Sequence, residues 1–217
     1  MPWGDILIPT FSEEELVRAE GYRCIAGLDE VGCGPLAGPV VAAAVVLPYP
    51  LEAPWLQQVR DSKLLTAARR ENLAPLISEV AVSVGIGVVP AHTIDRQGLT
   101  RARRLAMKLA VERLMPPPDY LLIDYVRLPD VALPQKGVRN GDSLCFSIAC
   151  ASIVAKVTRD LMMVEMDKAY PGYGFARHKG YMCKEHISCL RRLGPCPIHR
   201  RSFQPVKNCS EIRDETT

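Results

Sequence analysis

Two short apolar runs lie on either side of a turn-rich loop near the start of this 217-residue chain. Residues 24–28 (C-I-A-G-L) form the first run, and residues 40–47 (V-V-A-A-A-V-V-L) form the second. Their length, and the β-branched side chains of the second, predict buried strands. The segment between them must be a loop, because it contains Gly32, Gly34, Pro35, Gly38 and Pro39. The chain is therefore expected to build its fold on a sheet.

Helical and strand-like segments alternate after these two runs. Helices are predicted over residues 66–78, 99–114, 147–166 and 183–193, and further strands over 82–89, 120–123 and 131–136. A capping-box sequence at Ser12 predicts one more helix before the first strand, ending at Gly21. Pro75 is expected to shorten or bend its helix. This order of elements predicts an α/β fold with a mixed central β-sheet flanked by helices.

The length of the chain fits a single domain over residues 1–217. Hydrophobic residues make up 48% of it and charged residues 24%, as in ordinary globular proteins. Residues 170–209 are expected to form a small, basic, helical C-terminal appendage that binds substrate. The polar residues 210–217 are expected to be a disordered tail.

The charge of the chain is concentrated near its C-terminus. The net charge is only +3, which by itself does not indicate a nucleic-acid-binding protein. Between residues 175 and 207, however, there are eight Lys or Arg and one acid, Glu185. Such a segment is typical of a surface that binds a phosphate backbone, and equally of a solvated helix face.

Nothing in the sequence predicts secretion or membrane insertion. The N-terminus lacks a basic region followed by an apolar run, and the most apolar segment, residues 40–47, is too short to span a bilayer. None of the eight cysteines forms a C-x-x-C pair. We expect reduced thiols in a cytoplasmic protein.

Four acids stand at informative positions. Asp29 and Glu30 end the first strand, Asp124 ends the fourth, and Asp142 precedes the helix predicted from residue 147. Acids at strand ends can converge on one point, where they would repel one another unless a cation neutralised them. Oxygen ligands of this kind suit Mg²⁺ or Mn²⁺, and two such ions can catalyse phosphoryl transfer. The alternative interpretation is that these acids are ordinary turn residues and a helix cap.

Several blocks of sequence, in order along the chain, resemble one known family. The first and longest runs from Asp29 to Val40 (D-E-V-G-C-G-P-L-A-G-P-V). The others are D-S-K-L at 61–64, S-I-V-A-K-V-T-R-D at 152–160, Y-P-G-Y-G-F at 170–175 and H-K-G-Y at 178–181. Together they resemble the signature of ribonuclease HII, the type 2 ribonuclease H family, over residues 24–206.

The resemblance implies a ribonuclease H-like fold and an endonuclease that cuts RNA in RNA–DNA hybrids. Separately, we expect a monomer. It also implies cleavage of duplex DNA that contains ribonucleotides, leaving 3′-hydroxyl and 5′-phosphate ends. The family's acidic active-site and metal-binding positions fall on Asp29, Glu30, Asp124 and Asp142.

The resemblance also implies a set of substrate-binding residues. Gly32, Cys33 and Gly34 match a loop whose backbone meets the ribose 2′-hydroxyl, the group that separates RNA from DNA. Tyr181 matches the tyrosine that packs on the sugar at an RNA–DNA junction. Lys63 and Lys156 could neutralise phosphates, or could be surface lysines with buried stems.

The chain departs from the family pattern at two positions. Cys33 stands where the family loop usually has arginine, so one cationic phosphate contact is expected to be missing. Tyr125 follows Asp124, where many relatives have glycine.

Three other interpretations remain open at this point. The first is another ribonuclease H-fold nuclease or an integrase-like strand-transfer enzyme, which would use similar carboxylates. The second is a non-enzymatic nucleic-acid-binding module. The third is a zinc site formed by Cys183, His186 and Cys189, although their spacing does not match the paired ligands of known zinc modules.

Overall fold

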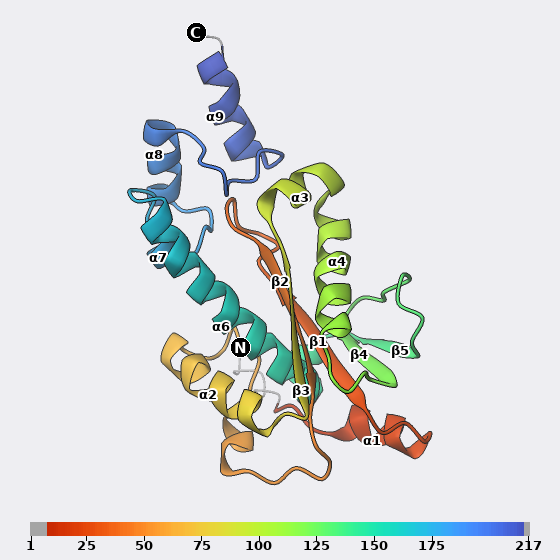
Figure 1. Ribbon diagram of the computed structural model, residues 1–217. Helices are drawn as coiled ribbons and strands as arrows, with labels where there is room; N and C mark the ends of the chain where they lie inside the picture. The colour runs from red at the N-terminus through yellow and green to blue at the C-terminus, as the bar shows by residue number, and fades with distance from the viewer. Residues whose placement is uncertain (1–7, 215–217) are drawn as a thin grey trace, which may run out of the picture.

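The computed structural model describes residues 8–214, and these form a five-stranded mixed sheet flanked by helices (Figure 1). The strand order is β3-β2-β1-β4-β5. The antiparallel pairs are β1–β2 and β2–β3, whereas β1–β4 and β4–β5 are parallel. The strands are β1 (Ile25–Val31), β2 (Val40–Val46), β3 (Ser83–Val89), β4 (Tyr120–Asp124) and β5 (Gln135–Val138).

Helices cover both faces of the sheet. In Figure 1, α4 lies on one side of the strands, and α2 and α6 lie on the other. The helices are α1 (Ser12–Ala19), the 3₁₀ turn η1 (Pro54–Gln58), α2 (Ala67–Val80), α3 (Ala91–Gln97), α4 (Leu99–Glu112), α5 (Gly141–Leu144), α6 (Phe146–Ala169), α7 (Phe175–His178), α8 (Lys184–Leu193) and α9 (Gln204–Asp214). The predicted α/β class is therefore confirmed.

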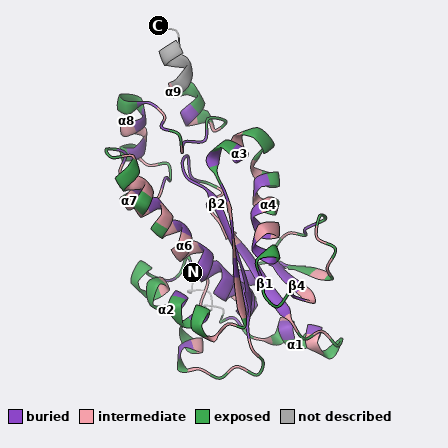
Figure 2. Cartoon of the chain, in the orientation of Figure 1, coloured by how far each residue is buried: buried purple, intermediate pink, exposed green. Residues whose placement is uncertain are grey.

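The core is divided by the sheet into two layers (Figure 2). Alternate residues of β2 point to opposite faces, so Ala42 and Ala44 pack with α4 while Ala43 and Val45 pack with α2 and α6. At Gly27 the backbone of α6 comes so close to β1 that a Cβ atom would collide with the main chain of Ser147. This close approach presses the start of α6 against the strand that carries two of the candidate acids.

The C-terminal segment continues beyond the far end of α6, where α7, α8 and α9 gather (Figure 1). Tyr173 and Phe175 stack with ring centroids 5.2 Å apart and pack with Met163 of α6. Leu190 of α8 and Val206 of α9 pack against Leu36 in the loop after β1. The appendage is thus joined both to α6 and to the 32–39 loop.

The structure differs from the sequence-based boundaries at several places. The last strand lies at Gln135–Val138 rather than at 131–136, because the Gln135 side-chain amide hydrogen-bonds the carbonyls of Leu128, Val131 and Leu133 and holds that stretch as a loop. Helix α2 continues through Pro75. Helix α9 extends to Asp214, within the segment expected to be a disordered tail, and 215–217 lie outside the described residues.

Two further observations bear on the predictions about membrane insertion and reduced thiols. In the described part of the chain, no helix is long and apolar enough to cross a bilayer. All eight cysteines are free thiols.

Candidate active site

The pleat of β1 directs its two terminal acids to opposite faces of the sheet. Asp29 follows Gly27 on the α6 face, where it is 5% exposed and hydrogen-bonds Ser152 of α6. Glu30 follows Leu28 on the α4 face, where Arg103 of α4 reaches it. The Asp29 carboxylate also accepts the Glu30 backbone N–H at 2.7 Å, which fixes its orientation.

Two more acids approach Asp29 from the neighbouring strand and the loop after β5. Asp124 ends β4, the parallel neighbour of β1, and accepts the Gly141 N–H at 2.8 Å. That bond joins β4 to α5, the single turn that carries the buried Asp142. The structure therefore gathers all four sequence-predicted acids at one edge of the sheet.

The acids influence one another's ionisation. Burial raises the pKa of Asp29 well above its usual value, and the charges of Glu30 and Asp124 raise it further. Burial raises the pKa of Asp124 too; the hydrogen bond from Gly141 opposes this rise and the charge of Asp142 adds to it. For Glu30, burial again raises the pKa, against the attraction of Arg103. The cluster therefore favours a bound cation.

Two basic side chains contact the carboxylates. Lys63 Nζ lies 2.9 Å from Asp142 Oδ2. Burial is the largest single influence and lowers the pKa of Lys63, but the hydrogen bond to Asp142 and the charges of Asp142, Asp61 and Asp29 together raise it above its usual value. Arg103 Nε lies 2.7 Å from Glu30 Oε1. The two groups form an ion pair, but the N–H does not point at the oxygen well enough to make a hydrogen bond. Arg103 was not predicted, because nothing in the helical pattern shows which strand end its side chain reaches.

The carboxylates do not form a finished metal cage. Within residues 8–214, no three or more His, Cys, Asp or Glu side chains lie close enough together to enclose an ion as they stand. One carboxylate oxygen, Glu30 Oε2, is nevertheless buried and has no hydrogen-bond partner among these residues. An unsatisfied anionic oxygen beside three other acids fits a hard divalent cation.

Lys63 is placed by a pair of serines. Ser62 and Ser152 share a buried hydrogen bond of 2.8 Å, which attaches the 61–64 loop to α6. Ser152 also hydrogen-bonds the Asp29 carboxylate. Both serines lie within the blocks that resemble the family, but their role was not predicted.

The loop after β1 lies beside Tyr181. Gly32 has a φ of 91°, which favours glycine. A Cβ atom on Gly34 would lie 3.9 Å from Tyr181 Cε1, and Tyr181 is 41% exposed. Lys156 Nζ lies 5.9 Å from the centre of the Tyr181 ring and pairs with Asp160 at 2.7 Å. The predicted substrate-binding residues Gly34, Lys156 and Tyr181 are thus brought together.

Cys33 faces the acids. Its Sγ lies 3.7 Å from Glu30 Oε1. Burial, with the negative charge of Glu30 adding to it, raises the pKa of the Cys33 thiol to about 11. The side chain is therefore a neutral thiol at physiological pH, which makes it a poor nucleophile.

The backbone explains the second departure from the family pattern. Tyr125 has a φ of 61° and a side chain that is 64% exposed. Glycine adopts this conformation more easily than tyrosine does, which fits the glycine that the family resemblance leads us to expect here.

The zinc interpretation is wrong for Cys183, His186 and Cys189. Cys183 caps α8 by accepting the His186 N–H at 3.4 Å. The buried His186 ring uses both nitrogens, Nδ1 toward the Tyr181 carbonyl (2.9 Å) and Nε2 toward His199 Nε2 (3.0 Å). Its nitrogens are therefore not free for a metal.

The basic C-terminal segment is only partly a charged surface. Lys184, Arg191 and Arg192 of the α8 region are exposed, whereas Arg200 is fully buried. Arg177 is exposed but pairs with Glu185, the single acid of that stretch. The exposed cations lie on the appendage that joins the Tyr181 loop.

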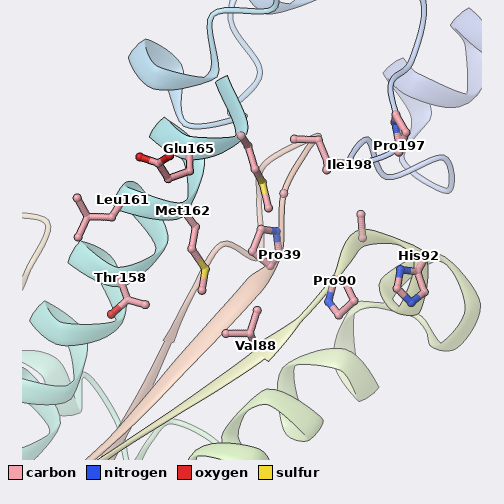
Figure 3. A pocket seen from close by; sticks show the side chains of 13 residues that line it. Pro39, Val88, Pro90, His92, Thr158, Leu161, Met162, Glu165, Pro197 and Ile198 are labelled. Carbon is pink, nitrogen blue, oxygen red and sulfur yellow. The ribbon is translucent and has the colours of Figure 1, made fainter. Parts of the chain in front are cut away.

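An apolar cavity of about 800 Å³ lies apart from the acids. Figure 3 shows Leu161 and Met162 of α6 on one side of it, with Val88 and Pro90 on the other. None of the four candidate acids lines it. Its chemistry is unsuited to phosphodiester hydrolysis, and it is not the candidate active site.

Comparison with known proteins agrees with this geometry. The profile of the family described as Ribonuclease HII matches residues 26–206. Ribonuclease HII of Dehalococcoides mccartyi is 54% identical over 202 residues, 93% of this chain and 95% of that protein. Ribonuclease HII of Geobacter metallireducens is 55% identical over 194 residues, 89% of this chain and 90% of that protein.

Solved structures show the same fold. The crystal structure of ribonuclease H2 from Pyrococcus horikoshii OT3 superposes with a TM-score of 0.74 at 22% identity, covering 89% of this chain and all of that one. Bst-RNase HIII in complex with Mn²⁺ has a TM-score of 0.68 at 22% identity, covering 90% of this chain and 71% of that one. From the fold, the family profile and these relatives together, the chain belongs to the ribonuclease HII family, the endoribonucleases that act on RNA–DNA hybrids.

Proposed function

We propose that Asp29, Glu30, Asp124 and Asp142 bind Mg²⁺ or Mn²⁺, and that this chain thereby hydrolyses the RNA strand of RNA–DNA hybrids. One observation carries the proposal: acids from β1, β4 and α5 meet at one sheet edge, where burial and mutual repulsion raise the pKa values of Asp29 and Asp124. Glu30 Oε2, which has no hydrogen-bond partner among residues 8–214, supports it, as does the all-oxygen donor set. The Mn²⁺ complex of the ribonuclease HIII with this fold is consistent with the same choice of metal.

When bound, divalent ions supply the positive charge that activates a water molecule and stabilises the leaving oxygen. The protein's part is to hold the ligands rigidly. Ser152 and the Glu30 amide orient Asp29, and the Gly141 amide orients Asp124. We expect hydrolysis to leave 3′-hydroxyl and 5′-phosphate ends.

Selection for RNA is assigned to the loop of Gly32, Cys33 and Gly34 together with Tyr181. In the described part of the chain, the amides of Cys33 and Gly34 donate to no protein acceptor, so they are available to a ribose hydroxyl. The exposed ring of Tyr181 beside Gly34 can pack on the same sugar. This arrangement suits a single ribonucleotide embedded in duplex DNA as well as a long hybrid.

Phosphate binding is assigned to Lys63, Lys156 and the exposed cations of the α8 region. Lys63 contacts Asp142 through Nζ while its side chain remains 77% exposed, so it can turn toward a phosphate once a metal ion neutralises the acids. The monomeric state and the cytoplasmic location predicted from the sequence stay predictions.

A cleavage assay on four substrates tests the proposal. These are a long RNA–DNA hybrid, duplex DNA with one ribonucleotide, an all-DNA duplex and an all-RNA duplex, each with EDTA, Mg²⁺ or Mn²⁺. We expect metal-dependent cleavage of the first two substrates only. Cleavage of the all-DNA duplex would favour an integrase-like enzyme, and tight binding without turnover in either metal would favour a binding module.

A further inference from the structure

Two arginine side chains are completely buried beneath the loop after β1. Arg200, from the C-terminal segment, donates to the carbonyls of Gly32 (2.5 Å), Cys33 (3.0 Å) and Gly38 (3.0 and 3.1 Å). Its three nitrogens therefore donate to three different carbonyls of one loop. Only the planar, forked guanidinium group of arginine offers donors in this arrangement.

Arg159, from α6, holds the other end of the same loop. It donates to the carbonyls of Ala37 (3.1 Å) and Pro39 (3.0 Å). Its third nitrogen donates to the carbonyl of Lys179 (3.0 Å), two residues before Tyr181, and its Cζ lies 5.8 Å from the centre of the Tyr181 ring. Arg159 thus ties the two segments that carry the proposed ribose contacts.

The charge of this pair is not neutralised locally. Within residues 8–214, no carboxylate lies at ion-pair distance from either guanidinium, and Asp160 and Asp95 act only from farther away. Burial, followed by the repulsion of Arg159, lowers the pKa of Arg200 to about 10, so it remains charged at neutral pH. Burying two charges without a counter-ion lowers the stability of the folded state. We therefore expect these arginines to serve the function of the protein.

The geometry of the loop indicates that role. Its carbonyls turn inward to the guanidiniums, while the amides of Cys33 and Gly34 donate to no acceptor among residues 8–214. Amides left free above a buried positive charge form a site for a hydroxyl or phosphate oxygen.

We propose that Arg159 and Arg200 are positioning residues for RNA recognition: they hold the 32–39 loop with its amides toward the nucleic acid, and Arg159 fixes that loop relative to Tyr181. Neither arginine touches the substrate. The inference rests on the proposed function, because it concerns the same ribose contacts.

Hydrogen–deuterium exchange of the metal-free protein, without nucleic acid, tests the clamp itself. Arg200→Met should speed exchange in residues 32–39, and Arg159→Met should do so in 32–39 and 179–183, with β2 unchanged. Arg23→Met, at the opposite and exposed end of β1, is the matched control and should change neither segment. Where a methionine variant does not fold, the lysine variant keeps the charge but loses the fork, and should show the same faster exchange.

Binding to a hybrid and to a DNA duplex of the same sequence tests the consequence. In an Asp124→Asn background, so that nothing is cut, each arginine variant should lower the hybrid-over-DNA affinity ratio by about two- to tenfold, the usual effect of losing one neutral amide–hydroxyl hydrogen bond to the ribose. A general loss of stability would lower both affinities together and leave the ratio unchanged.

The outcomes separate the two proposals. Unchanged exchange in 32–39, or faster exchange with an unchanged affinity ratio, would overturn the positioning role. If the parent protein does not prefer the hybrid at all, the proposed function fails and so does the role in RNA recognition. The exchange data then show separately whether the arginines hold the loop.

Discussion

Replacing Gly32 with alanine tests how tightly the loop after β1 is packed on the arginine beneath it. A φ of 91° in a residue with a side chain costs about 1–3 kcal/mol. The new Cβ would also lie 2.7 Å from the Pro39 carbonyl oxygen and overlap the Arg159 side chain, and such overpacking costs a further ~1–3 kcal/mol. We therefore expect Gly32→Ala to lower the free energy of unfolding by about 2–6 kcal/mol, a large part of the stability of a typical domain.

Gly21→Ala is the matched control. Gly21 has a similar φ of 106°, but its Cβ would meet nothing within 4 Å, so only the conformational cost of about 1–3 kcal/mol applies. Urea denaturation of the three proteins gives both losses, provided that the m values agree. Equal losses in the two variants would refute the close approach of Arg159 and Pro39 to Gly32.

Four further predictions concern single side chains at the site. Tyr181→Ala should lower kcat/KM on an embedded ribonucleotide by roughly 5- to 150-fold, since a stacking contact is worth about 1–3 kcal/mol; an unchanged value would remove Tyr181 from junction recognition. Cys33→Ser should cleave at nearly the normal rate, because the thiol is neutral with a pKa of about 11, and loss of activity would indicate a direct role for sulfur. Cys33→Arg should steepen the slope of log K against log salt by about 0.7–0.9, and an unchanged slope would show that the new side chain points away from the phosphates. Burial raises the folded pKa of Asp29, so its contribution to stability is complete below the unfolded pKa and is lost as pH rises through the folded value. Asp29→Asn should therefore raise the Tm of metal-free protein at neutral pH, and identical pH profiles for the two proteins would contradict the burial of that charge.

The sheet and its major helices were predictable because their sequence patterns are local. The β-branched run at β2 and the apolar spacing of α4 identify their elements without knowledge of the rest of the chain. The last strand was misplaced because its start depends on the Gln135 side chain, whose contacts lie in the preceding loop. Hydrophobic pattern carries no information about such a bond.

The four acids were found because strand ends and a family resemblance both indicated them. The residues that contact or position these acids and the 32–39 loop were not predicted, since each lies far from its partner in the sequence. Arg103 reaches Glu30 from α4, and Arg200 reaches Gly32 across 168 positions. In a sequence, Arg200 is one more member of a basic segment, and only packing distinguishes a buried guanidinium from a surface cation.

Cleavage of a long RNA–DNA hybrid by folded Asp124→Asn protein tests the central claim most directly. Asparagine keeps the size and one acceptor oxygen of Asp124 but removes the negative charge that a metal ion needs, and Asp130→Asn, on the exposed loop before β5, is the control. With circular dichroism confirming that all three proteins are folded, the single-turnover rate in Mg²⁺ or Mn²⁺ should be normal for Asp130→Asn and abolished or nearly abolished for Asp124→Asn. A near-normal rate for folded Asp124→Asn would contradict the proposed metal site.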